Sequence, residues 1–339
     1  MKKITFTLLL LLVVCSGIHA QNVITIDNST GSNAQFNDLQ TAIASASSGD
    51  ILYVHPSETN YGNIEVDKPL TLIGFSHSSA DKQTLITDLT LSSNASNVTV
   101  TGFRITDDLF IANGTPINNV VLENNRFESS MVINNGGVDN LVVRGNVINT
   151  MGSGSSTGDT FTNTLITNNL FYGSGLRLRF HESVTVKNNI FLTSDVFNSR
   201  EETGNVTVQN CIFIGNTSGT ANFNDDGVFF ENCLAYNRSS GNTEALVGTN
   251  NIVNIDPLFT EDNDNANFDA LLDNYILQPS SPGIASGVNG ENIGIFDGGN
   301  FTFNNIGLTN GIPTVNIDAI STTVAPGQNL NVIISTTNN

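Results

Sequence analysis

The 339-residue chain is 39% hydrophobic and only 13% charged, and its 31 acidic against 12 basic residues give a formal net charge of −19. A protein this acidic repels nucleic acid and anionic membrane, so neither is expected as a partner. After residue 20, no apolar run approaches the roughly 18 residues of a membrane-spanning helix, so no transmembrane segment is expected.

Residues 1–20 have the pattern of a secretory signal peptide. Lys2 and Lys3 form its basic start, Leu8 to Val14 its apolar stretch, and Ala20 is the small residue before the expected cleavage site. We therefore expect the mature chain to be exported to the exterior or to the cell surface of a bacterium, and we expect a monomer.

A short amphipathic helix is predicted over residues 36–47. Its apolar residues recur at the helical spacing of three or four: Leu39, Ala42, Ile43 and Ala46. Strands are predicted to follow at 51–54 and 70–73. A helix in this place can cover the open end of a stacked β-structure, which would otherwise expose core and backbone.

A nine-residue phrase then recurs in steps of 20 to 23 residues. Its copies begin at Asn97, Asn119, Asn140, Asn163, Ser183, Asn205 and Gly227. Within each copy apolar and polar residues alternate, as in Val98-Thr99-Val100-Thr101, which indicates a strand with one buried face. A fixed period of this length predicts an all-β solenoid whose coils stack in parallel, because each repeat buries its apolar face only against its neighbours.

Two positions of the phrase carry further information. The sixth is always Gly or Asn, the residues that tolerate a left-handed turn, and Asn side chains there are expected to form a ladder from coil to coil. The ninth is expected to form an inward stack: Ile105, Phe127, Ile148, Phe171, Phe191, Phe213 and Ala235.

Cys211 and Cys233 occupy the seventh position of adjacent copies, so they are predicted to be stacked neighbours. An oxidising compartment permits a disulfide between them. The parallel side chains of in-register neighbours are a poor geometry for that bond, so two buried thiols are favoured and the bridge stays open as an alternative.

The two ends of the repeat region carry a resemblance to a known family. The N-terminal end reads FNDLQTAIASASSGDILYVHPSETNYGNIEVDKPLTLIGF (36–75), and the C-terminal end contains DPLF (256–259), YILQPSSPGIASG (275–287) and IGIFDGG (293–299). Over about residues 24–300 the chain resembles secreted right-handed parallel β-helix proteins of the pectin-lyase-like superfamily. The resemblance implies a right-handed β-helix, and it is weak for activity, because the superfamily includes lyases, hydrolases, esterases and proteins with no known activity.

These observations divide the chain into three parts: a signal peptide at 1–20, a right-handed parallel β-helix with a short N-terminal capping helix and a closing coil at 21–300, and a C-terminal linker with a short β tail at 301–339. The tail alternates like two strands around a Pro-Gly turn over residues 313–337.

The residue patterns of the related enzymes are largely missing. The chain lacks the Gly-His-Gly and Arg-x-Lys motifs of polygalacturonase-like hydrolases, and it has no Trp for a pectin-methylesterase-like site. A lyase needs a base for the C5 proton and a neutraliser for the uronate carboxylate. Lys187, in the outward fifth position of the phrase, is the best candidate for the catalytic base.

One basic stripe is a candidate substrate-binding site. Residues 175–181 alternate, which places Arg177, Arg179 and His181 together on the outer face of a strand. Such a stripe could bind a carboxylated or sulfated glycan. The competing interpretation is an ion pair between coils, because Glu201 lies one coil beyond Arg179.

An oxygen-rich loop in the closing coil is a candidate calcium site, with Asp262, Asp264 and Asp269 as ligands. Its spacing does not match the known calcium-loop motif, and a solvated loop is the alternative. Taken together, the sequence predicts a non-catalytic scaffold that contacts polysaccharide or envelope proteins. The alternative is a lyase or hydrolase that acts on acidic, uronate-containing polysaccharide.

Overall fold

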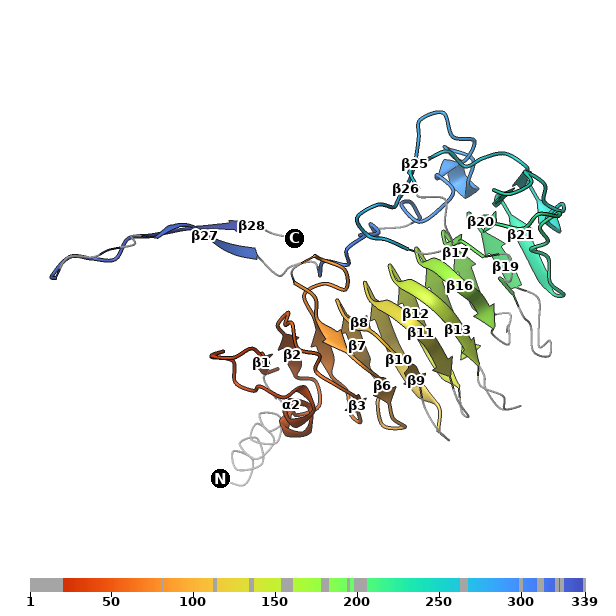
Figure 1. The fold of residues 1–339 in the computed structure, drawn as a ribbon. Helices are drawn as coiled ribbons and strands as arrows, with labels where there is room; N and C mark the ends of the chain where they lie inside the picture. Colours follow the sequence, from red (N-terminus) through yellow and green to blue (C-terminus); the bar gives the residue numbers. More distant parts are fainter. Residues whose placement is uncertain are drawn as a thin grey trace, which may run out of the picture.

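The computed structural model describes residues 21–80, 82–111, 115–133, 137–153, 161–177, 183–193, 196–197, 206–262, 268–298, 301–309, 314–320, 323 and 326–337. The described chain winds into a parallel β-solenoid with one short α-helix at its N-terminal end (Figure 1). The all-β fold class predicted from the repeat is thereby confirmed. The predicted signal peptide lies outside the described residues.

Two long parallel sheets run the length of the solenoid, and nearly every coil adds one strand to each. Sheet A consists of β1 (Val23–Ile26), β2 (Ile51–Val54), β4 (Thr71–Ile73), β7 (Val98–Thr101), β10 (Ile117–Glu123), β12 (Val138–Arg144), β14 (Phe161–Thr162), β15 (Thr164–Thr167), β17 (Val184–Lys187), β19 (Val206–Gln209), β21 (Val228–Glu231) and β23 (Gly248–Thr249). Strands of neighbouring coils pair in register, so each position of the phrase forms a column along the sheet.

Sheet B follows sheet A in each coil, after the turn at the sixth position of the phrase. It consists of β3 (Ile64–Val66), β5 (Leu85–Ile86), β6 (Leu89–Leu91), β8 (Arg104–Ile105), β9 (Leu109–Ile111), β11 (Arg126–Ile133), β13 (Val147–Ser153), β16 (Leu170–Arg177), β18 (Ile190–Phe191), β20 (Ile212–Gly215), β22 (Leu234–Asn237) and β24 (Ile252–Val253). Register shifts between β11 and its neighbour β13 mark where this sheet bends around the coil.

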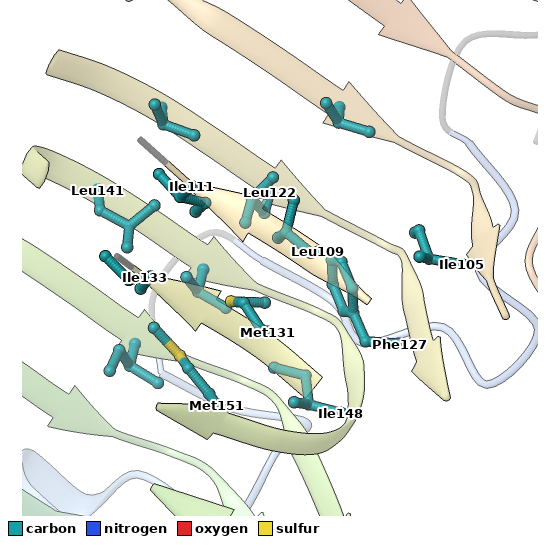
Figure 2. Close-up of a cluster of buried hydrophobic side chains, with 14 of the residues drawn as sticks. Ile105, Leu109, Ile111, Leu122, Phe127, Met131, Ile133, Leu141, Ile148 and Met151 are labelled. Atoms are coloured by element: carbon teal, nitrogen blue, oxygen red, sulfur yellow. The ribbon is translucent and has the colours of Figure 1, made fainter. Parts of the chain in front are cut away.

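The core fills the space between the two sheets, as the alternation predicts. Figure 2 shows side chains from both sheets meeting there, among them Leu122 and Leu141 from sheet A and Phe127 and Ile148 from sheet B. The inward stack predicted for the ninth position is confirmed in the later coils. The ring of Phe191 stacks between those of Phe171 and Phe213, with centroid separations of 4.7 and 5.1 Å.

The turn between the sheets is the predicted left-handed one. The sixth-position residues all have positive φ, between 52° and 79°: Gly102, Asn124, Gly145, Asn168, Asn188, Asn210 and Asn232. Only Gly, and to a lesser degree Asn, adopts this backbone readily, which explains why no other residue occupies the position.

Asn ladders exist, but the prediction that one lies at the sixth position is wrong. An exposed ladder joins Asn97, Asn119 and Asn140 at the first position, and a buried ladder lies at the seventh. Oδ1 of Asn146 accepts from the backbone N–H of Asn125 at 2.9 Å, and Oδ1 of Asn169 accepts from that of Asn146 at 3.0 Å. In the next coil, Oδ1 of Asn189 accepts in the same way from the backbone N–H of Asn169 at 2.9 Å. The seventh-position side chains point into the coil and are fully buried, so each amide must find its partner in the neighbouring coil.

Cys211 and Cys233 continue the same ladder as two free, buried thiols. Sγ of Cys211 lies 3.3 Å from the backbone nitrogen of Asn189, in the place of an Asn oxygen. Burial raises the pKa of the Cys233 thiol well above its usual value, so it stays protonated and unreactive. Their role is therefore to fill the core of two adjacent coils.

A segment after the last coil returns along the outside of the solenoid toward its N-terminal end (Figure 1). We call residues 281–298 and 301–309 the return strap; it includes a short 3₁₀ turn, η1 (Val288–Gly290). The sixth-position amides donate to it: Asn232 to Ser286 O at 2.8 Å and Asn168 to Ile295 O at 2.8 Å. These turn side chains therefore bind the strap instead of one another.

The strap covers a second apolar cluster on the outer side of sheet B. The eighth position of the phrase points outward, yet from the third copy on it is apolar: Val147, Leu170, Ile190, Ile212 and Leu234. Ile293, Ile295 and Phe303 of the strap, together with Phe268 and Tyr275, bury this column. The cluster therefore fastens the strap across five coils.

The N-terminal end of the solenoid is covered by its short helix. The helix α2 (Leu39–Ser45) begins after Asp38, whose carboxylate accepts from the N–H of Thr41 at 2.7 Å, and it buries the predicted apolar face. After the last coil, β25 (Phe259–Glu261) and β26 (Asn274–Leu277) form an antiparallel pair that packs on the outer side of sheet B.

The C-terminal residues form a separate antiparallel hairpin of β27 (Thr314–Ile320) and β28 (Val332–Thr337), which stands away from the solenoid (Figure 1). No helix in the described part of the chain is long and apolar enough to cross a membrane.

Candidate functional site

The outer face of sheet A holds Lys187, the candidate base. It is the last residue of β17, and its column neighbours are Thr167 and Gln209. The same column contains an ion pair between Arg144 and Glu123. Lys187 is partly buried and makes no ion pair within the described residues, and no carboxylate adjoins it in register.

Only Arg177 of the predicted basic stripe is among the described residues. It ends β16 of sheet B, where its backbone pairs with that of Gly152. Arg179, His181 and Glu201, and with them the ion pair expected between coils, lie outside the described residues. The described members of the two candidate sets, Lys187 and Arg177, therefore belong to different faces of the solenoid.

A cluster that sequence reasoning missed lies on sheet B near the N-terminal end. Oε1 of Glu128 accepts from both Arg104 and Arg126, at 2.8 and 3.2 Å, and the Arg126 guanidinium lies over the Phe268 ring at 5.4 Å. Arg126 also approaches Ser78 Oγ at 3.3 Å. These contacts join two coils to the chain after the last coil, which gives the cluster a structural role.

His77 lies beside that cluster and is fully buried. Burial lowers the pKa of its imidazole to about 3, and the nearby Arg126 and Arg104 charges act in the same direction. Its Nδ1 lies 2.7 Å from Ser78 Oγ, and Gly307 of the strap packs directly on its ring. The imidazole is therefore neutral near pH 7, and its enclosure leaves no room for substrate.

A cleft of about 640 Å³ lies at the C-terminal end of the solenoid. One wall comes from sheet B and the residues after it, with Tyr236 and Arg238 from the β22 region. The other comes from the loop 256–258 and the strand β25, with Phe259 and Glu261. The cleft thus combines aromatic rings, amides, hydroxyls and charged groups, which can contact both the faces and the hydroxyls of a sugar.

An ion pair between Arg238 and Asp262 forms one side of this cleft. Their side chains are only 12% and 11% exposed, so the pair is held in place by burial. Asp262 is one of the three predicted calcium ligands, and a guanidinium here occupies the position that a cation would take.

Of the other two predicted calcium ligands, Asp269 is the one that the structure describes. Asp269 accepts from the N–H of Leu271 at 2.9 Å, closing a local turn, and Asp264 lies outside the described residues. Within the ranges that the structure describes, no three His, Cys, Asp or Glu side chains are grouped to hold a metal ion. The calcium site stays a prediction.

The loop between the last coil and β25 has a strained backbone. Leu258 has φ of 56°, a left-handed conformation that is uncommon for a bulky residue. Two hydrogen bonds hold it there: its N–H donates to Asp256 Oδ1 at 2.8 Å, and its carbonyl accepts from the N–H of Gln278 at 2.9 Å. Strain that the surroundings maintain is a mark of binding sites, and here it fixes one wall of the cleft.

No protein-family model matches the chain, and a search of curated proteins found no match either. The structure alone therefore establishes the fold. The features that bear on function are the C-terminal cleft, Lys187 on sheet A and Arg177 on sheet B.

Proposed function

We propose that this chain is an exported, non-catalytic β-helix scaffold of the pectin-lyase-like type, which binds glycan through the cleft at its C-terminal end. The observation that carries the proposal is the composition of that cleft. It offers Tyr236 and Phe259 as aromatic surfaces and a set of amide, hydroxyl and carboxylate groups, a lining suited to sugar rings.

The lining of the C-terminal cleft does not support the competing function, cleavage of acidic polysaccharide. Elimination requires a base and a cationic neutraliser on one substrate. Among the described residues that line the cleft there is neither Lys nor His, and Arg238, the one cation among them, pairs with Asp262. Lys187 and Arg177 belong to different sheets, so they make a poor pair for one cleft.

Both functions can be tested with the mature protein in calcium-containing buffer. We expect no rise in ultraviolet absorbance from unsaturated product on polygalacturonate or alginate, and retention of the protein on at least one immobilised glycan. Tyr236→Ala should lose that retention, whereas Tyr53→Ala, on the outer face of sheet A far from the cleft, should keep it. Product that forms with the parent protein and disappears with Lys187→Ala would establish the lyase instead.

A further inference from the structure

The charges of the cleft do not balance. Among the described lining residues, Asp256, Glu261 and Asp262 contribute three carboxylates, against one guanidinium, that of Arg238. Because Arg238 and Asp262 pair with each other, the carboxylates of Asp256 and Glu261 remain exposed to any bound molecule. The cleft is thus negatively charged.

Several hydrogen-bond donors of the lining are already used inside the protein. The amide of Gln278 donates to Phe259 O at 2.9 Å, and the hydroxyl of Thr260 donates to Ile276 O at 2.9 Å. The hydroxyl of Ser239 likewise donates to the side-chain oxygen of Asn216. Their oxygen atoms keep free lone pairs, so these groups offer acceptors to a ligand.

The negative charge of the lining and its free hydrogen-bond acceptors together indicate which ligand the cleft can bind. We infer that the cleft takes an uncharged, hydroxyl-rich glycan and excludes uronate chains, an inference that rests on the proposed glycan-binding function. Sugar hydroxyls donate to carboxylates in charge-assisted hydrogen bonds, which are roughly twice as strong as neutral ones. The faces of sugar rings can pack on Tyr236 and Phe259, whereas a uronate carboxylate would meet like charge.

The strained loop keeps one of these carboxylate acceptors in place. Because Leu258 is held in its left-handed conformation by Asp256 and Gln278, the carboxylate of Asp256 keeps its place before a ligand arrives. A fixed acceptor loses less conformational freedom on binding than a mobile one. The strained loop therefore holds the Asp256 carboxylate ready to accept a hydrogen bond from a sugar hydroxyl.

The test compares glycans that differ in charge on one pair of charge-removing variants. Calorimetric titration of the full mature chain would use cellohexaose, xylohexaose and mannohexaose as neutral probes, a galacturonate hexamer as the acidic probe and a chitosan hexamer as the cationic probe. The variant Asp256→Asn/Glu261→Gln removes both free charges and keeps side-chain shape. Its matched control, Glu58→Gln/Asp107→Asn, removes two exposed carboxylates remote from the cleft.

We expect the parent protein to bind at least one neutral hexamer with little dependence on salt, and to bind the galacturonate hexamer at least roughly ten-fold more weakly. In the cleft variant, binding of the neutral hexamer should weaken by roughly ten-fold while binding of the galacturonate hexamer strengthens. The control variant should behave like the parent in both titrations.

The outcomes separate this inference from the function on which it rests. If no glycan of any charge binds, the proposed function itself fails. If the galacturonate hexamer binds best, or only the chitosan hexamer binds and does so in a salt-dependent way, glycan binding stands and the inference is overturned. Neutral binding that is unchanged in the cleft variant also overturns it, because the site then lies elsewhere.

Discussion

Phe191→Asp is expected to abolish cooperative folding of the solenoid. The Phe191 ring is fully buried and stacks between two further Phe rings in the neighbouring coils. Removing a buried Phe costs about 3–5 kcal/mol, and an unpaired carboxylate in the same place costs several more. The sum is comparable to the whole free energy of unfolding of an ordinary domain, about 5–15 kcal/mol.

Circular dichroism during thermal unfolding measures this effect. Phe191→Leu is the matched control, because it keeps an apolar side chain and should lower the melting temperature by only a few degrees. A Phe191→Asp protein that melts like the parent would show that the stacked column contributes little to stability.

Ile295→Asp is expected to detach the return strap and to leave the interior of the solenoid folded. Ile295 is fully buried in the apolar cluster between the strap and the outer side of sheet B, which is separate from the core between the sheets. A carboxylate at this position should cost at least about 3 kcal/mol of strap binding. The apolar eighth-position column would then become exposed.

Limited proteolysis and binding of a hydrophobic dye would measure the release. The strap of the variant should be cut early and dye should bind, while the far-ultraviolet spectrum stays that of the parent. Ile284→Asp is the control, because Ile284 is 37% exposed in the same strap and should tolerate the change. Cutting and dye binding at parental levels would contradict a role for Ile295 in fastening the strap.

The repeat made the interior of the fold predictable, because the burial of Val98, Phe127 or Phe191 depends only on period and alternation within one coil. The ladder was misplaced by one position because Asn occupies both positions six and seven in several copies. The sequence alone does not say which amide points inward. Burial decides it, since an inward amide must be satisfied by the next coil.

The strap and the cleft could not be predicted in the same way. The contact of Asn168 with Ile295 spans 127 residues, and no local pattern carries such a distance. The apolar eighth position was nevertheless a signal, since an outward column of Leu and Ile requires a cover. Asp262 was singled out for the oxygen-rich composition around it, whereas its partner Arg238 becomes visible only when the coils are stacked.

Hydrogen–deuterium exchange of the mature protein, with and without the tightest-binding neutral hexasaccharide, tests most directly the claim that the C-terminal cleft is the glycan-binding site. The account predicts ligand-dependent protection confined to the amides around Tyr236 and Arg238 and to residues 256–262. Protection centred instead on the outer face of sheet A around Lys187, or on β16 at Arg177, would contradict it. The glycan-binding site would then lie at those residues.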